Sequence, residues 1–209
     1  MITAIAAIRG RRVWDSRGRP TVEADVTLAD GSMGRAIAPA GASTGSGEAL
    51  DRRDGGAAFG GYDVTLAVAA VNEVIAPAIA GIDGADQAGL DARLIALDNT
   101  ANKSRLGANA TLAVSMAAAH AAAASARVPL YVHLGGADAT LMPLPQIQIF
   151  GGGAHAGRRV DIQDFLVICP GARSFAQALD WTAEIYRAAG SLMKARGSLQ
   201  GVADEGGWW

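Results

Sequence analysis

The first forty residues alternate between apolar and polar positions, as half-buried strands do. The alternation is clearest over 21–28 (TVEADVTL), where every second side chain is apolar. Segments of similar character occur at 3–10 and 34–38, and Asp30-Gly31 is typical of a tight turn before the last of them. Three short strands joined by turns predict an antiparallel meander.

Helical spacing replaces this alternation over the next hundred residues. Apolar side chains recur at helical intervals over 63–75 and 86–97. The segment 106–126 is dominated by alanine and carries no charged residue, but polar side chains interrupt it and alanine contributes little to membrane insertion. We therefore expect a buried helix there, and a compact α+β domain over 1–130.

The pattern changes after residue 140. Two apolar segments, 147–150 and 163–168, have the character of strands, and 174–196 has the spacing of a long amphipathic helix with Ser174 as its N-cap. Strands combined with a long helix predict the opening of an α/β layer. Because a closed eight-stranded barrel typically needs roughly 250 residues, 140–209 can supply only the first part of one.

Composition and charge limit the classes of molecule that the protein is expected to bind. The 209 residues carry a formal net charge of −2, so the sequence gives no reason to expect nucleic-acid binding. The one cysteine, Cys169, cannot form an internal disulfide and is flanked by apolar residues, which is typical of a buried thiol in a reducing compartment. The amino terminus lacks the basic and apolar regions of a secretory signal. We expect a cytoplasmic protein without a membrane span.

Four short segments carry side chains that could do chemistry: 41–45 (GASTG), 151–157 (GGGAHAG), 163–165 (QDF) and 204–207 (DEGG). Loops of glycine and serine can close over a ligand, and a histidine framed by glycines can approach a phosphate or hydroxyl group. Each segment alone is also typical of an ordinary solvated loop. The four segments indicate a function only when they are taken together, in their order along the chain.

Together with 15–23 (DSRGRPTVE) and 102–109 (NKSRLGAN), these segments resemble the enolase family. The resemblance runs from about Ile5 to Trp208. Enolases are magnesium-dependent carbon-oxygen lyases that dehydrate 2-phosphoglycerate to phosphoenolpyruvate in glycolysis. The resemblance implies an amino-terminal capping domain over 1–130, followed by the incomplete start of the catalytic α/β barrel over 140–209.

The resemblance also implies a role for individual residues. Ser43 matches a ligand of a second magnesium ion, and His155 and Gln163 match residues that contact the substrate. Glu205 matches the general acid that protonates the departing hydroxyl, and Asp164 matches the carboxylate that supports it. A second carboxylate nearby would raise the pKa of such an acid by like-charge repulsion.

The remaining catalytic groups of the family have no counterpart in this chain. The base is a lysine and the main Mg²⁺ ligands are three acidic residues, all in later strands of the barrel. We therefore expect residues 1–209 to be inactive alone. The resemblance further implies a homodimer or higher homo-oligomer. Arg11, Arg17 and Glu23 match family positions near the subunit interface, which would also suit a dimerisation module.

Several positions depart from the family pattern. Asp164 replaces a glutamate and is one methylene shorter, Gln148 replaces an asparagine, and Arg158 and Arg159 add two cations near the expected substrate mouth. Two alternatives to enolase activity stay open. One is an enolase-like lyase that acts on a related phosphorylated or phosphonate acid. The other is a non-catalytic fragment that serves as an interaction or dimerisation module.

Overall fold

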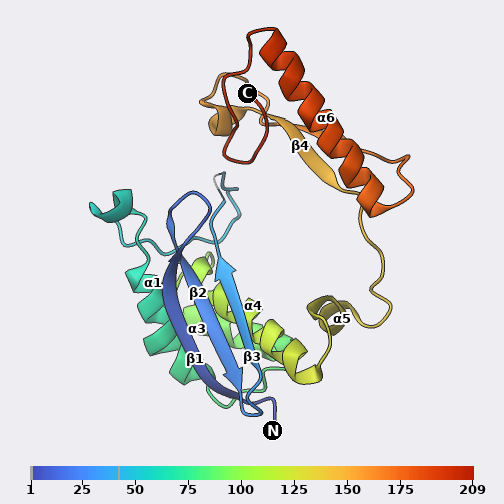
Figure 1. Cartoon of the computed structure of the whole chain (residues 1–209). Coiled ribbons are helices and arrows are strands. Elements are labelled where there is room, and N and C mark those ends of the chain that lie inside the picture. The colour runs from blue at the N-terminus through green and yellow to red at the C-terminus, as the bar shows by residue number, and fades with distance from the viewer. Residues whose placement is uncertain (1, 42) are drawn as a thin grey trace. The chain divides into compact units, whose positions relative to one another are not determined.

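The computed structural model describes residues 2–41 and 43–209, which form two compact units, Met1–Ala139 and Thr140–Trp209. The first unit contains a three-stranded sheet covered by helices, and the second contains a strand pair and one long helix (Figure 1).

The sheet of the first unit is the predicted antiparallel meander. Its strands are β1 (Ile5–Trp14), β2 (Pro20–Leu28) and β3 (Met33–Ala38), in the order β1-β2-β3. β1 ends four residues later than the alternation predicts, because its pairing with β2 continues to Trp14 opposite Pro20. An ion pair of 2.5 Å between Arg11 and Glu23 joins the two strands across this extension.

The helices of this unit follow the sheet in the sequence. The chain is helical from Thr65 to Ile79, with a π-helical segment just before the turn that contains Pro77. The helical segment ends four residues later than predicted. Pro77 does not end it, because the proline lies in the first turn of the last helix, where a missing N–H is tolerated. The elements are η1 (Ala58–Gly61), α1 (Thr65–Ala69), η2 (Ala70–Ile75), α2 (Ala76–Ile79), α3 (Gln87–Asp98), α4 (Ala108–Ala126) and α5 (Leu130–Gly135).

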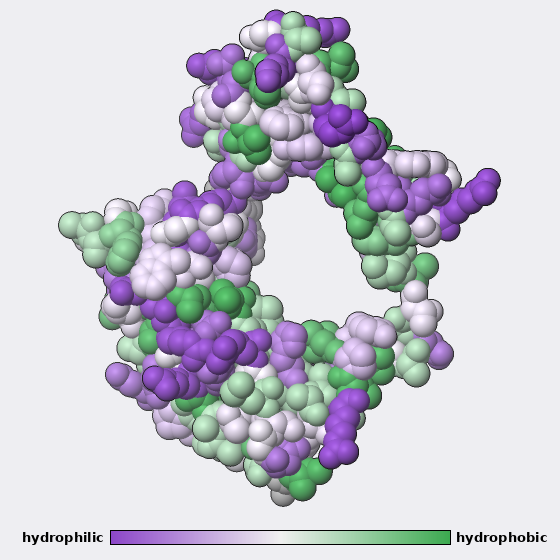
Figure 2. All heavy atoms as spheres, in the orientation of Figure 1, coloured by the Kyte–Doolittle hydropathy of each residue, from purple (hydrophilic) through white to green (hydrophobic). Residues whose placement is uncertain are grey.

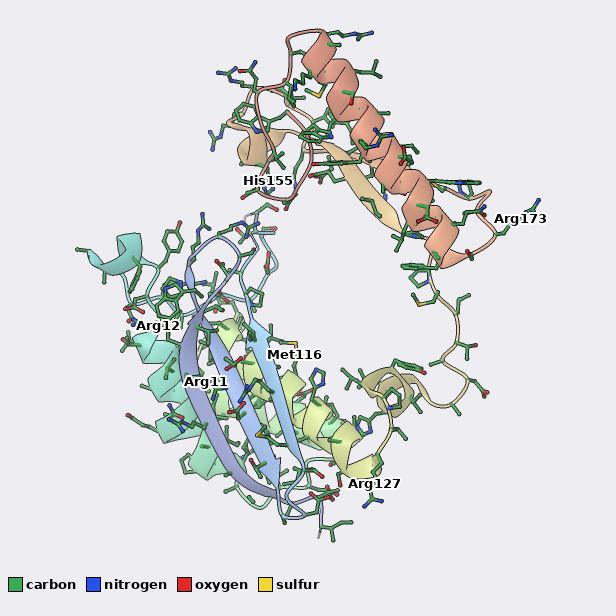
Figure 3. The ribbon with its side chains drawn as sticks, in the orientation of Figure 1. Arg11, Arg12, Met116, Arg127, His155 and Arg173 are labelled. Atoms are coloured by element: carbon green, nitrogen blue, oxygen red, sulfur yellow. The ribbon has the colours of Figure 1, made fainter. Side chains whose placement is uncertain are left out.

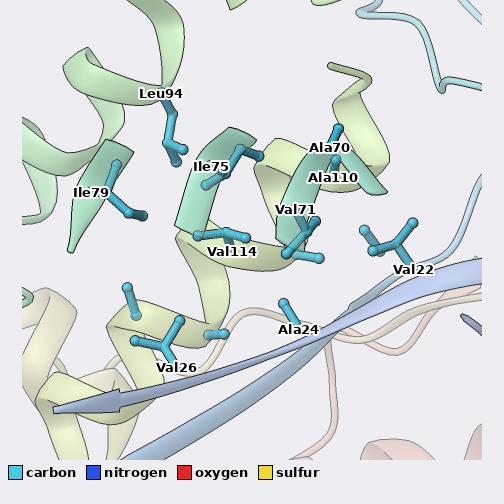
Figure 4. Close-up of a cluster of buried hydrophobic side chains, with 14 of the residues drawn as sticks. Val22, Ala24, Val26, Ala70, Val71, Ile75, Ile79, Leu94, Ala110 and Val114 are labelled. Atoms are coloured by element: carbon cyan, nitrogen blue, oxygen red, sulfur yellow. The ribbon is translucent and has the colours of Figure 1, made fainter. Parts of the chain in front are cut away.

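The core of the first unit lies between the sheet and these helices. The inward side chains of β2, among them Val22, Ala24 and Val26, face Val71, Ile75 and Val114 (Figure 4). All six are buried, with at most a trace of exposed surface. The apolar positions of the alternating pattern are thus the ones that line the core.

α4 is the buried, alanine-rich helix that the sequence predicts, and most of its residues are buried. Small side chains let its backbone approach the sheet. A Cβ atom on Gly34 of β3 would lie 2.1 Å from the carbonyl oxygen of Ala117 and 2.2 Å from the amide nitrogen of Ala121. Over the described residues, no helix has both the length and the apolar character to cross a membrane.

The opposite face of the sheet carries a cluster of four charged side chains, Arg11, Glu23, Asp25 and Arg35. Asp25 accepts hydrogen bonds from the Arg35 Nε atom at 2.6 Å and from the Arg11 Nη1 atom at 2.7 Å. The side chain of Asp25 is only 15% exposed. These bonds, that of Arg35 first, lower the pKa of Asp25 from 3.8 to about 2. Figure 3 shows Arg11 on the strands of this sheet.

We expect Asp25→Asn to lower the free energy of unfolding of the first unit at pH 7 by on the order of 1 kcal/mol. The depressed pKa means that the folded state favours the carboxylate, so its stabilisation is present above about pH 4 and is lost as the pH falls toward 2. The difference between variant and wild type, measured by denaturant unfolding, should therefore shrink over this range. Asp138→Asn, at an exposed position of the same unit, is the control. A difference that is independent of pH would contradict the prediction.

The second unit contains β4 (Gln146–Gly151), η3 (Gly153–Ala156), β5 (Asp164–Ile168) and α6 (Phe175–Ala195). β4 and β5 pair in antiparallel orientation. Ser174 caps α6 as predicted, since its hydroxyl oxygen accepts a hydrogen bond from the Gln177 amide at 3.1 Å. Near the end of the chain, Trp208 bridges to Phe150 of β4 in parallel orientation.

Large apolar side chains remain exposed on this unit. They occur on both β5 and α6, and green side chains gather on the surface of the unit in Figure 2. They include Phe165, Leu166, Ile168, Leu179, Trp181, Ile185 and Leu192. Apolar surface of this kind is typical of a sheet that other elements extend and cover.

Candidate active site

Three segments that are separate in the sequence meet beside β4. They are the loop that follows β4, the residues that enter β5, and the loop at 203–207. Backbone hydrogen bonds hold them together: Gly152 N donates to Gln163 O at 2.7 Å, and Gly151 N donates to Trp208 O at 3.0 Å. The three motifs that the sequence analysis singled out in this unit thus form one cluster.

Two glycines permit this close approach. A Cβ atom on Gly152 would lie 2.0 Å from the Ile162 carbonyl oxygen. A Cβ atom on Gly207 would lie 2.5 Å from the Gly151 amide nitrogen and 2.6 Å from the Gln148 Oε1 atom. Since real Cβ atoms do not come this close to backbone atoms, larger residues would separate the loops.

α6 anchors the loop at 203–207 from the other side. The Tyr186 hydroxyl donates to the Gly206 carbonyl at 2.8 Å, and the Trp208 Nε1 atom donates to the Tyr186 carbonyl at 2.8 Å. The two rings stack with their centroids 4.5 Å apart. Gly190 leaves room for the indole, because a Cβ atom there would lie 2.7 Å from it. The acidic loop is therefore fixed to the helix rather than free in solvent.

His155 lies at the centre of the cluster and is not a solvated loop histidine. Its side chain is 1% exposed, and its Nδ1 atom lies 2.5 Å from the Asp204 Oδ1 atom. Figure 3 shows His155 within its unit. A carboxylate acceptor at Nδ1 favours the tautomer with the proton on that nitrogen. The Nε2 atom is buried and has no hydrogen-bond partner among the residues that the structure describes, and it lies 3.4 Å from the Glu205 Oε1 atom.

The amide of Gln148 joins the two carboxylates of the cluster. Its Nε2 atom donates to the Asp164 Oδ1 atom and lies 3.4 Å from the Glu205 Oε2 atom. Its Oε1 atom accepts a hydrogen bond from the Gly207 amide at 2.9 Å. Asp164 and Glu205 are therefore neighbours with a shared amide donor between them.

Four of the five predicted site residues lie in this unit. Asp164, His155 and Glu205 belong to the cluster, and Gln163 lies just before β5, where its carbonyl bonds to Gly152 while its side chain is exposed. Ser43 lies in the other unit, in an exposed loop after β3. Its neighbour Ala42, part of the same sequence motif, lies outside the described residues.

Sequence reasoning missed two members of the cluster. The sequence marks Gln148 only as a departure from the family pattern, and Asp204 only as part of the acidic segment 204–207. Gln148 stands between the apolar residues Ile147 and Ile149, which is unusual in an apolar strand. Because successive side chains of a strand point to opposite faces, its amide points away from the face on which Ile149 is buried. No signal in the sequence pairs Asp204 with His155, since 49 residues separate them.

The donor set of the cluster does not fit a magnesium ion. Mg²⁺ prefers several oxygen ligands in octahedral geometry. Residues 2–41 and 43–209 hold no group of three or more His, Cys, Asp or Glu side chains arranged for a metal. The carboxylates of the cluster instead face an amide and an imidazole, and this arrangement is suited to holding and moving a proton.

Comparison with known families and proteins agrees with the two-unit division. Residues 5–134 match the family model "Enolase, N-terminal domain", and residues 139–209 match "Enolase, C-terminal TIM barrel domain". These matches confirm the predicted α+β domain followed by the first part of an enolase-type barrel.

Two curated relatives are similar over nearly the whole chain. An enolase of Acidothermus cellulolyticus is 54% identical over 207 residues, which cover 99% of this chain and 48% of the relative. Enolase 1 of Desulfitobacterium hafniense is 50% identical over 205 residues, which cover 98% of this chain and 47% of the relative. The chain thus spans about half the length of these relatives. On the family matches and these identities, the chain belongs to the enolase family.

Proposed function

We propose that this chain, within a complete enolase barrel, takes part in the magnesium-dependent dehydration of 2-phosphoglycerate to phosphoenolpyruvate. Family membership supports the class of reaction, and one observation supports the role of this chain in it. That observation is the cluster in which Glu205 lies between the imidazole of His155 and the amide of Gln148. Removal of a hydroxyl group is assisted by a proton donor held in a fixed position.

In this proposal Glu205 is the general acid. Its side chain is 34% exposed whereas that of His155 is 1% exposed, so a substrate can reach the carboxyl group from the open side of the cluster. Asp164 orients it through the shared amide. His155 and Gln163 contact the substrate, and Asp204 holds the His155 ring in place.

The proposal assigns the remaining chemistry to groups beyond these residues. Bound magnesium would supply the positive charge that the reaction needs next to the substrate carboxylate. From this chain we propose only Ser43 as a ligand, of a second ion. The carboxylate ligands and the lysine base would come from later barrel strands. We also propose a homodimer or higher homo-oligomer that works in the cytoplasm.

A lyase reaction on a different acid is the second candidate. Arg158 and Arg159 are both exposed and follow the His155 loop, and the Arg158 amide donates to the Gly153 carbonyl at 2.7 Å. The Arg159 guanidinium lies over the Trp209 ring, 5.6 Å from its centroid. Two added cations in this segment would suit a related phosphorylated or phosphonate acid that carries an anionic group in a different place from 2-phosphoglycerate.

Formation of phosphoenolpyruvate, followed by ultraviolet absorbance with magnesium present, tests the proposal. We expect turnover of 2-phosphoglycerate by a protein in which this chain is joined to the rest of an enolase barrel, and none by residues 1–209 alone. Robust turnover by residues 1–209, lost on replacing Glu205, would overturn the assignment of the base and main metal ligands to later strands. Turnover of a phosphonate acid but not of 2-phosphoglycerate would favour the second candidate.

A further inference from the structure

The imidazole of His155 has one ring nitrogen with a partner and one without. The Nδ1 atom lies against the Asp204 carboxylate, which can only accept a hydrogen bond while it is ionised, so the ring proton belongs on Nδ1. The Nε2 atom of the neutral ring is then an acceptor. It is buried, and no group in the part of the chain that the structure describes donates to it. A buried polar atom of this kind requires an explanation, and a neighbouring group that can carry a proton supplies one.

Glu205 has a donor on one side and this acceptor on the other. Its Oε2 atom lies 3.4 Å from the amide nitrogen of Gln148, and its Oε1 atom lies 3.4 Å from the Nε2 atom of His155. The Gly207 amide donates to the Gln148 Oε1 atom at 2.9 Å, so it is the NH₂ group of Gln148 that faces Glu205. A neutral carboxyl group has one accepting and one donating oxygen and matches both neighbours. A carboxylate would leave the Nε2 atom without a donor.

We propose that the site holds a proton on the Oε1 atom of Glu205 before the substrate binds, and that this proton is donated to the Nε2 atom of His155. Asp204 is a positioning residue in this arrangement, because its carboxylate keeps the ring proton on Nδ1 and leaves Nε2 free to accept. An imidazolium beside a carboxylate is the alternative. Burial disfavours it, since the side chain of His155 is 1% exposed and a charged ring is destabilised where water is excluded.

The consequence for catalysis rests on the proposed function, in which Glu205 is the general acid, but the hydrogen bond itself does not. An ordinary glutamate is ionised at neutral pH and has no proton to give. In the proposed arrangement the proton on Oε1 passes to the departing hydroxyl group, which leaves as water, and Glu205 keeps the electron pair of the broken O–H bond as a carboxylate. The contact of His155 with the substrate belongs to the occupied site, whereas this hydrogen bond belongs to the site that awaits substrate.

Nitrogen NMR of the chain of residues 1–209, labelled at its three histidines, locates these protons at the pH of the dehydration assay. We expect the ring proton of His155 on Nδ1, and an Nε2 signal shifted by an accepted hydrogen bond. Glu205→Gln should keep this signal, because glutamine also has one accepting and one donating group. Glu205→Ala should move it toward that of a free acceptor nitrogen. Asp180→Asn, at an exposed position on α6, is the control and should change neither nitrogen.

Two results would overturn the proposal. One is a His155 ring that carries a proton on Nε2, alone or together with Nδ1, in the wild-type chain. The other is an Nε2 signal that is the same in wild type and in Glu205→Ala. Asp204→Asn tests the positioning role, because its NH₂ group can donate to Nδ1 and so favours the other tautomer. We expect part of the ring population to move its proton to Nε2, and an unchanged tautomer would remove the role of Asp204.

The effect on turnover is measured with Asp204→Asn placed in a complete barrel. We expect kcat for 2-phosphoglycerate to fall roughly tenfold with KM little changed, because Asp204 acts through His155 and Glu205 and not on the substrate. Asp180→Asn should keep both constants. A larger effect on KM than on kcat would contradict the positioning role. The expected NMR results without turnover by the wild-type complete protein would instead leave the hydrogen bond standing and remove the proposed function.

Discussion

Replacing Glu205 by glutamine in a complete, active protein is expected to lower the rate of dehydration roughly 10²–10⁴-fold, the usual contribution of general acid catalysis. Glutamine keeps the length of the side chain and its place between His155 and Gln148, but it has no proton to deliver. The loss should therefore fall on kcat, with KM little changed. Steady-state kinetics with 2-phosphoglycerate at saturating magnesium measure both.

Ser43→Ala is the comparison for this variant. Ser43 lies in the unit that does not contain the cluster, and its proposed part is to hold a second magnesium ion. We expect a smaller loss of rate and a higher magnesium requirement. Full activity of the Glu205→Gln variant would remove the proposed proton donor, and a loss in Ser43→Ala larger than that in Glu205→Gln would reverse the assignment of roles.

Gly34→Ala is expected to destabilise the first unit by about 3 kcal/mol or more, the upper end for an added methyl group in a packed core. The new Cβ atom would overlap the backbone of α4 at Ala117 and Ala121, and a backbone cannot rotate away as a side chain can. Since a domain is stable by only about 5–15 kcal/mol, this loss would be a large part of the total. Hydrogen exchange of the α4 amides in wild type and variant measures it.

Gly47→Ala is the matched control, because Gly47 is exposed and no atom of residues 2–41 or 43–209 lies within 4 Å of the Cβ atom it would gain. It should leave the exchange of α4 unchanged. Equal protection of α4 in the Gly34→Ala variant would show that the helix can move away from the sheet, and it would contradict the close contact between β3 and the alanine-rich helix.

The sequence predicts the architecture well where local pattern decides it. Alternation locates β2 and β3 within a residue, and the N-cap at Ser174 marks the start of α6. The alternation underestimates the length of β1, because the consecutive residues Arg11 and Arg12 interrupt it although residues 11–14 still pair with β2. An ion pair between strands has no signature in the spacing of apolar residues.

The candidate site is predictable only in part for the same reason. Motifs identify His155, Asp164 and Glu205, since each stands in a distinctive local sequence. The contacts that join them depend on residues far apart in the chain: Gln148 and Asp164 are 16 residues apart, and His155 and Asp204 are 49 apart. The sequence does not show that these residues are in contact, because they come together only when the loops fold against β4.

Exchange of the C2 proton of 2-phosphoglycerate with deuterated water, catalysed by the Glu205→Gln variant of a complete protein, tests the central claim most directly. If Glu205 acts only on the departing hydroxyl, the base that removes the C2 proton is intact. Proton NMR should then show continued exchange at C2 while formation of phosphoenolpyruvate is roughly 10²–10⁴-fold slower than in wild type. Loss of exchange and dehydration to the same extent would contradict the account, because Glu205 would then act in proton abstraction.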